Sequence, residues 1–210
     1  TNGNVANTFV VIAVTGKVVD KRGRSMKEIS AFIVEDTDPG FSQGKHEKKM
    51  GIRGSSTCDL IFEDCVIPKD RLLGKKGDGF KIAMKTLDGG RIGIAAQSVG
   101  IAQGALNEAI KYGKQRKQFG KPINAFQNTQ FKLAELQTKV DAARLMTWRA
   151  AKAKDNHENY GVYAAMAKLF ASDVANEVTR ACVQFMGGYG YCREYPVERM
   201  MRDAKITEIY

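Results

Sequence analysis

The stretch "AKLFASDVANEVTRACVQF" (167–185) decides the second part of the fold. Its apolar residues recur at intervals of four and three along the chain: Ala167, Ala171, Val174, Val178, Ala181 and Phe185. A helix turns once in about 3.6 residues, so this spacing places all of them on one face. The stretch therefore predicts a long helix whose apolar stripe packs against other helices.

Two further helices are expected before this one. Leu133, Leu136, Val140 and Ala143 repeat the same spacing, and a glycine-containing helix begins near Phe80. Glycine costs a helix about 1 kcal/mol against alanine, which is tolerable where a backbone or a ligand must approach closely. Long segments joined by short loops predict an antiparallel, four-helix-type bundle with three long helices and one short one.

The first third of the chain has the pattern of strands. Three apolar or alternating runs predict them, over 8–16, 29–36 and 56–68, and turn residues separate these runs. The fold class is therefore α+β, a partial antiparallel β domain followed by the helical bundle. We expect the domains to cover residues 1–75 and 76–210, with "GKKGDG" (74–79) as the hinge between them.

Composition and charge argue against nucleic-acid binding and against a membrane protein. The formal net charge is +10 over 210 residues, but basic residues are scattered among acidic ones and form no nucleic-acid motif. We therefore expect no nucleic-acid partner; a lysine-rich surface and a phosphorylated small molecule explain the charge. No apolar run reaches the ~20 residues of a membrane span, so we expect a soluble protein.

The few cysteines and histidines argue against metal chemistry. The four cysteines form no CxxC pair, with Cys58 and Cys65 expected on opposite faces of one strand, and His46 and His157 lie far apart in the sequence. Reduced thiols fit this pattern better than disulfides or zinc, and a histidine-based triad is not expected. We expect no metal site and set hydrolysis aside.

Three stretches carry the candidate site residues, and each has a simpler structural interpretation. Arg116 in "RKQFG" (116–120) could bind a phosphate through two hydrogen bonds or only complement a helix dipole. The glycines of "QFMGGYGY" (184–191) could let backbone amides approach a pyrophosphate or only cap a helix. In "TLDGGRIG" (86–93), Asp88 and Arg91 are spaced for an intrahelical ion pair, although the glycines between them leave space beside both charges.

Together these stretches resemble the acyl-CoA dehydrogenase family, closest to its short-chain, butyryl-CoA type. The resemblance covers nearly the whole chain through six segments: "TNG" (1–3), 49–74, 79–106, "RKQFGKPI" (116–123), "VQFMGGYGY" (183–191) and "RDAKITEIY" (202–210). It implies an FAD enzyme of fatty acid β-oxidation, assembled as a homotetramer (a dimer of dimers), in bacterial cytoplasm or the mitochondrial matrix. The chain would then hold the second part of the middle β domain and most of the C-terminal bundle, and we expect it to be truncated at both ends.

The resemblance also assigns roles to individual residues. Arg116 would reach the FAD pyrophosphate across the subunit interface, Phe119 would lie nearby, Gln127 would lie on the adenosine side, and Thr1 would contact the flavin ring. A further segment would line the neighbouring subunit's FAD: Gln184, Phe185, Met186, Gly187 and Gly188. The acyl-CoA substrate would be lined by Asp88, Gly89, Gly90 and Arg91.

The resemblance implies no catalytic residue within the chain itself. In the family, the segment similar to "TEIY" (207–210) continues into a glutamate that removes the proton alpha to the thioester carbonyl. Some relatives carry the base just before the arginine that Arg91 matches, but Gly90 stands there and has no side chain to act. We therefore expect the parent protein to dehydrogenate short-chain acyl-CoA and reduce electron-transfer flavoprotein, and residues 1–210 alone to be inactive. An acyl-CoA oxidase and a non-catalytic assembly module remain the alternatives.

Overall fold

The computed structural model describes residues 1–210, which form two compact units. The β unit comprises Thr1–Lys49 and Arg53–Leu87, and the helical unit comprises Met50–Ile52 and Asp88–Tyr210. Along the chain, the boundary between Leu87 and Asp88 falls within helix α1, which spans Gly79–Gln115. The predicted α+β class is confirmed, while the domain boundary predicted at residue 75 stays a prediction.

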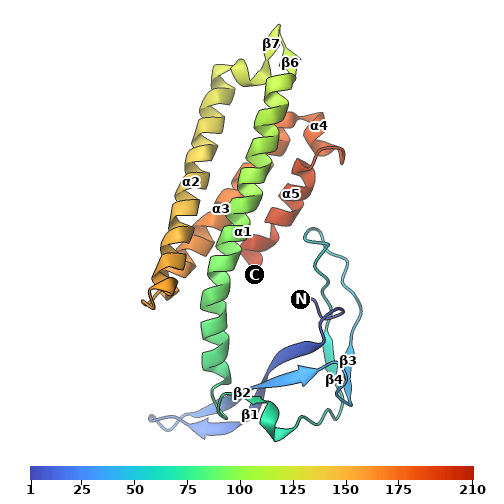
Figure 1. Ribbon diagram of the computed structural model, residues 1–210, viewed down its shortest axis with the longest axis vertical. Coiled ribbons are helices and arrows are strands. Elements are labelled where there is room, and N and C mark those ends of the chain that lie inside the picture. Colours follow the sequence, from blue (N-terminus) through green and yellow to red (C-terminus); the bar gives the residue numbers. More distant parts are fainter. The chain divides into compact units, whose positions relative to one another are not determined.

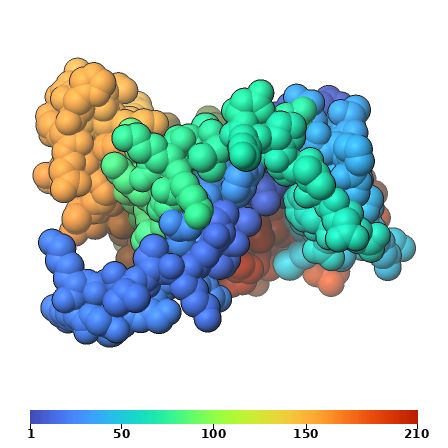
Figure 2. Space-filling view, turned by 90° about the horizontal axis from the view of Figure 1, so that it is seen from below, coloured from blue at the N-terminus to red at the C-terminus, as the bar shows by residue number.

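The β unit is built on a long antiparallel hairpin. Strand β1 (Thr8–Val19) pairs with β2 (Ser25–Glu35), and the short β5 (Leu72–Leu73) extends the sheet in the order β1-β2-β5. The register runs from Thr8 opposite Glu35 and shifts between Val14 and Gly16, where a bulge occurs. In the space-filling view the hairpin, in blue, forms an arm of this unit (Figure 2).

The strand predicted over 56–68 is much shorter than expected. Only β4 (Leu60–Phe62) forms, paired with the equally short β3 (Phe41–Gln43). Asp64, two residues after β4, adopts the left-handed conformation with φ 50°, which takes the backbone out of extended geometry there. Cys58 and Cys65 therefore lie outside the strand, and the expectation that they occupy its opposite faces was wrong.

Ser30 and Gly79 explain how α1 begins within the β unit. Ser30 is fully buried, its hydroxyl lies 2.8 Å from the Thr15 hydroxyl, and it accepts a 3.0 Å bond from the Gly77 N–H. A Cβ added to Gly79 would lie 2.5 Å from the Ser30 carbonyl carbon. Only glycine lets the first turn of α1 approach β2 this closely.

The helical unit contains the predicted bundle of long helices. Helices α1, α2 (Gln127–Asp155) and α3 (Gly161–Met186) lie side by side (Figure 1). The chain then continues through three shorter helices: α4 (Gly188–Tyr191), α5 (Val197–Ala204) and α6 (Ile206–Ile209). The expectation of three long helices and a shorter one near the C-terminus agrees with this, and α4 and α6 add single turns.

Small apolar side chains fill the core of the bundle. The stripe residues Ala167, Ala171, Val174 and Val178 are all at most 4% exposed, as predicted from their spacing. They pack in one cluster with buried residues of the other two long helices, among them Ala95, Ala102, Ala105, Leu106, Leu136, Val140 and Ala143. Because alanine projects little from a helix, the backbones can approach closely along their length.

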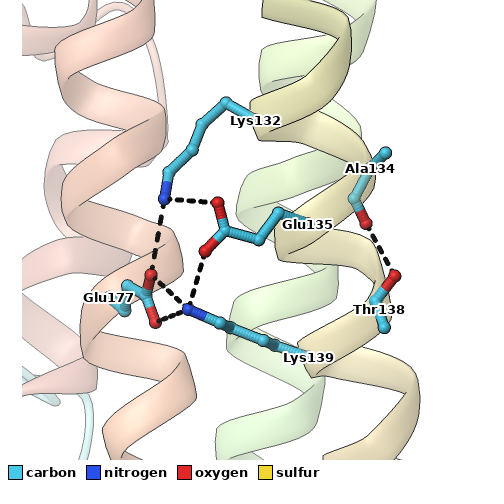
Figure 3. A network of polar contacts seen from close by, with 6 residues as sticks. All are labelled: Lys132, Ala134, Glu135, Thr138, Lys139 and Glu177. Carbon is cyan, nitrogen blue, oxygen red and sulfur yellow. Dashed lines mark hydrogen bonds and ion pairs between the residues drawn. The ribbon is translucent and has the colours of Figure 1, made fainter.

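A charged network links α2 to α3 on the outside of this core. The Lys139 ammonium lies 2.8 Å from Glu177 and 2.9 Å from Glu135, and Lys132 contacts both carboxylates (Figure 3). The hydrogen bond from Lys139 keeps the pKa of Glu135 below its usual value. All four side chains are partly exposed, so each ion pair contributes little to stability.

Candidate functional site

A groove opens at the end of the helical unit where α1 stops and α3 gives way to α4. Strands β6 (Lys117–Gln118) and β7 (Lys121–Pro122) form a small hairpin at this end (Figure 1). The groove has a volume of about 650 Å³, within the usual range of ligand pockets. Its walls are formed by Tyr112, Arg116, Gln118, Ile123, Phe185, Met186, Gly187, Gly188, Tyr189 and Cys192.

The backbone of Arg116 is fixed on both sides. Its N–H donates to the Tyr112 carbonyl at 2.9 Å, and its own carbonyl accepts from the Ile123 N–H at 2.9 Å. The intervening hairpin closes at Phe119 and Gly120, whose φ values of 50° and 78° fit a two-residue type I′ turn. These bonds hold Arg116 at the mouth of the groove.

The Arg116 side chain has no carboxylate within ion-pair distance and takes part in none of the salt bridges. Its guanidinium carbon instead lies 5.4 Å from the centre of the Tyr189 ring. Phe119, which the resemblance places beside the cofactor, is 93% exposed at the hairpin tip. Its ring meets Phe126 edge-on, with the centres 6.3 Å apart.

Of the two adjacent glycines, Gly187 caps α3 and Gly188 begins α4. Gly187 has φ 60° and ψ −137°, and its N–H donates to the carbonyls of Val183 at 3.1 Å and Gln184 at 3.2 Å. A Cβ added to Gly187 or Gly188 would meet nothing within 4 Å. The capping interpretation is therefore confirmed, and the same glycines leave a bare stretch of backbone on the wall of the groove.

Gln184 and Gln127 lie away from this wall. Gln184 lines a second hollow of about 230 Å³ between α2 and α3, together with Leu133, Leu136 and Phe185. Gln127 is exposed and is the first residue of α2, directly before Asn128 of the same hollow. Phe185 lines both hollows, so the predicted cofactor residues of the helical unit gather at one end of it.

The predicted substrate residues lie on α1, far from Arg116. Asp88 and Arg91 form the expected ion pair at 2.6 Å, and both side chains remain partly exposed. A Cβ added to Gly90 meets nothing within 4 Å, and one added to Gly89 lies 3.4 Å from the Lys154 ammonium nitrogen. Arg91 and Arg116 are separated by about 37 Å along the helix, at about 1.5 Å per residue. A single chain therefore does not bring the two predicted groups into one site.

Thr1 belongs to the β unit and is exposed. The next residue, Asn2, is held by a 2.7 Å bond from its N–H to the Ser56 carbonyl. At Gly3, a Cβ would come within 2.5 Å of the Cys58 sulfur, so this segment packs tightly beside its neighbour. The role of Thr1 at the flavin ring stays a prediction.

Several groove residues were not predicted from the sequence. Tyr112, Gln118, Ile123, Tyr189 and Cys192 line the groove without having been assigned to the site. Two features of the sequence could have pointed to the tyrosines. Tyr112 lies four residues before Arg116, about one helical turn away, and Tyr189 follows directly on the two glycines.

Metal-binding clusters, disulfides and membrane-spanning helices are absent from the structure. No three His, Cys, Asp or Glu side chains cluster in a way that could hold a metal ion, and all four cysteines are free. None of the helices combines the length and the apolar character needed to cross a membrane.

Family models match both parts of the chain. The model for the acyl-CoA dehydrogenase middle domain matches residues 1–65, and that for the acyl-CoA dehydrogenase C-terminal domain matches residues 77–210. The chain belongs to the acyl-CoA dehydrogenase family. The resemblance on which the predicted site residues rest is thereby confirmed, although the comparison does not test those residues one by one.

Solved acyl-CoA dehydrogenases and related chains share this fold. Butyryl-CoA dehydrogenase from Megasphaera elsdenii is 52% identical, with a TM-score of 0.93 over 100% of this chain and 53% of that one. A chain solved with the electron transferring flavoprotein of Acidaminococcus fermentans is 56% identical, with a TM-score of 0.92 over 100% and 54%. An acyl-CoA dehydrogenase from Bacillus anthracis, complexed with FAD, is 35% identical, with a TM-score of 0.89 over 100% and 38%.

The chain spans about half the length of the curated acyl-CoA dehydrogenases that it matches. A short-chain-specific acyl-CoA dehydrogenase from Clostridium acetobutylicum is 55% identical over all 210 residues, which make up 54% of that protein.

Proposed function

We propose that the parent protein is an FAD-dependent dehydrogenase of short-chain acyl-CoA thioesters, which it converts to trans-2-enoyl-CoA. The groove at Arg116 carries this proposal, because an arginine without a carboxylate partner faces a glycine backbone there. The short-chain and butyryl-CoA relatives, at 55% and 52% identity, support the substrate class.

The residues of the groove fit the pyrophosphate of FAD. Arg116 offers a planar fork of N–H donors that matches phosphate oxygens, and Gly187 and Gly188 present no side chain that would exclude them. Phe119, Gln127, Gln184, Phe185 and Met186 would hold the remainder of the cofactor from the same end of the unit. We propose that Thr1 contacts the flavin ring.

Asp88, Gly89, Gly90 and Arg91 would line the acyl-CoA. Gly90 leaves open space beside the Asp88–Arg91 pair, so a thioester could lie against the helix backbone there. Removal of the α-proton needs a desolvated carboxylate, with hydrogen-bond donors facing the developing enolate. Bound FAD would accept the hydride that leaves the β carbon.

The carboxylate base would follow Tyr210 in the parent protein. The Tyr210 hydroxyl lies 2.5 Å from the Gln97 side-chain oxygen, which places the last residue of the chain against α1. Gln97 is about 9 Å from Arg91 along the helix, so a residue after Tyr210 would be close to the predicted substrate group. We therefore infer that residues 1–210 alone, which do not include this base, do not catalyse acyl-CoA dehydrogenation.

The proposal extends to assembly and partners. A homotetramer, a dimer of dimers, would bring Arg116 of one chain to the FAD of another, since Arg91 and Arg116 are about 37 Å apart along the axis of α1. Exposed apolar side chains on α2 and α3 support burial of parts of these helices against another subunit: Leu145, Trp148, Met166 and Leu169. Electrons would pass to electron-transfer flavoprotein, in bacterial cytoplasm or the mitochondrial matrix.

The cofactor assignment is tested by flavin retention in the full-length protein. We expect Arg116→Gln to weaken FAD binding at least tenfold, because a charge-assisted bond to phosphate contributes about 1.5–3 kcal/mol. Lys114→Gln removes the same charge from the last turn of α1 outside the groove and serves as the matched control. Equal flavin affinity in both variants would exclude Arg116 from the cofactor site.

The reaction is tested by adding butyryl-CoA to the full-length protein without oxygen. We expect the yellow flavin absorbance to bleach, and no bleaching would overturn the dehydrogenase proposal. Admitting oxygen then separates the two enzymes: a reduced flavin that persists until electron-transfer flavoprotein is added is a dehydrogenase, whereas rapid reoxidation indicates an acyl-CoA oxidase. Turnover by residues 1–210 alone would contradict the proposed position of the base.

A further inference from the structure

Three tyrosine rings contact one another beside Arg116. Tyr112 comes from α1, Tyr189 from α4, and Tyr195 from the loop before α5. The ring centres are 6.0 Å apart for Tyr112 and Tyr189, 5.8 Å for Tyr189 and Tyr195, and 5.7 Å for Tyr112 and Tyr195. The two contacts of Tyr195 are edge-to-face, the geometry that aromatic pairs prefer.

This arrangement fixes the Tyr189 ring from two sides. Its remaining exposed surface, 48% of the residue, includes the side that faces the groove. Tyr112 and Tyr195 are half-buried, and burial raises the pKa of the Tyr112 hydroxyl. The cluster is therefore a packed aromatic support, and the Arg116 guanidinium lies against its Tyr189 ring.

We propose that Tyr189 is a positioning residue that holds the Arg116 guanidinium at the wall of the groove, ready for a phosphate group. The inference rests on the proposed cofactor site and adds to it the residue that orients the arginine. The ring face attracts the cation through its quadrupole and accepts none of the N–H donors in the guanidinium plane. The donors therefore remain free for the phosphate oxygens.

Arg202, in the same unit, shows the alternative arrangement. Its Nε and one Nη donate to the Glu198 carboxylate at 2.9 and 3.1 Å, and the other Nη donates to the Met50 carbonyl at 2.8 Å. That arginine is fully engaged and serves as a structural link. Arg116 has no such acceptors, so the ring of Tyr189 is what limits its side-chain freedom.

The test measures FAD dissociation from the full-length protein by flavin fluorescence. We expect Tyr189→Leu to raise the dissociation constant about two- to fivefold, the range of a partly exposed cation–π contact. Tyr189→Phe keeps the ring face and should restore wild-type affinity. Tyr191→Leu is the matched control, since Tyr191 lies on the same short helix, is 83% exposed and takes no part in the cluster.

A double variant shows whether Tyr189 acts through Arg116. In the Arg116→Gln background, Tyr189→Leu should cause no further loss of affinity. The same loss in both backgrounds would mean that Tyr189 contacts the cofactor by itself, and wild-type affinity of Tyr189→Leu would likewise overturn the inference. If Arg116→Gln alone has no effect, the cofactor site fails and not merely its positioning residue.

Discussion

Two arginines stand near the two ends of the part of α1 that belongs to the helical unit, and their surroundings differ. Arg91 lies three residues after Asp88 and pairs with it at 2.6 Å. Arg116 follows the helix, has no carboxylate partner, and lies over the ring of Tyr189. In the sequence both arginines stand near glycines; local spacing predicts the partner of Arg91, but no local pattern predicts that of Arg116.

The two arginines therefore differ in whether their charge and N–H donors are available to a ligand. A carboxylate partner neutralises an arginine and uses its N–H donors, whereas an aromatic partner orients the cation and leaves both charge and donors available. The Arg116 end is thus suited to bind an anion directly. At the Arg91 end, the open backbone at Gly90 is the feature most available to a ligand.

The largest expected effect is a difference in reactivity between two thiols, which tests whether the groove beside Arg116 is open to solvent. Cys192 is an exposed wall residue of the groove, while Cys182 is 1% exposed and burial raises the pKa of its thiol to about 12. Against a free thiol near 8.5, this lowers the thiolate population at pH 8 about a thousandfold. Iodoacetamide should modify Cys192 in the flavin-free full-length protein and leave Cys182 unmodified, as read by peptide mass spectrometry.

The control for this labelling is the unfolded protein. In urea both thiols should react, because burial is the cause of the protection. Protection of Cys192 in the folded, flavin-free protein would mean that the groove is covered, which would remove the contrast between the two ends.

Two glycines of α1, Gly113 near Arg116 and Gly93 near Arg91, test how tightly the helix is packed at each place. A Cβ at Gly113 would lie 2.8 Å from the Phe185 ring and 3.3 Å from the Asn124 Cβ, whereas one at Gly93 meets nothing within 4 Å. We expect Gly113→Val to lower the free energy of unfolding by about 1–3 kcal/mol through overpacking. Gly93→Val, measured by the same urea titration, should change it by less than about 0.5 kcal/mol. Equal effects would show that Phe185 yields without cost.

Much of the helical unit could be predicted from the sequence because one periodicity governs it. The spacing of Ala171, Val174 and Val178 places them on one face, and all are buried. The β unit was harder to predict, since an alternating pattern does not show how far a strand continues. The strand expected over 56–68 ends after Phe62, where Asp64 takes a left-handed conformation that alternation does not encode.

The site could be predicted only in part. The capping role of Gly187 and the Asp88–Arg91 pair depend on local spacing, and both were recovered. The contact of Arg116 with Tyr189 joins residues 73 positions apart, and no local pattern contains it. The cluster of Tyr112, Tyr189 and Tyr195 was missed for the same reason.

Replacing Gly90, next to Arg91, with alanine should stabilise the protein. Its added Cβ would be in open space, and alanine is favoured over glycine within a helix by about 0.8–1.0 kcal/mol. Gly90→Ala should therefore raise the free energy of unfolding by about 0.5–1 kcal/mol. A loss of stability, measured by urea unfolding, would mean that the backbone at Gly90 is packed against another part of the full-length protein.

The smallest expected effect is the coupling between Asp88 and Arg91. A double-mutant cycle of Asp88→Asn and Arg91→Gln isolates it from other changes in each variant. Both side chains are partly exposed, so we expect a coupling of about 0.3–0.5 kcal/mol in urea unfolding. High salt should reduce it further, because exposed charges are screened. A coupling several times larger would mean that Arg91 is committed to Asp88 as a structural pair, and the substrate group would then consist of the glycine backbone alone.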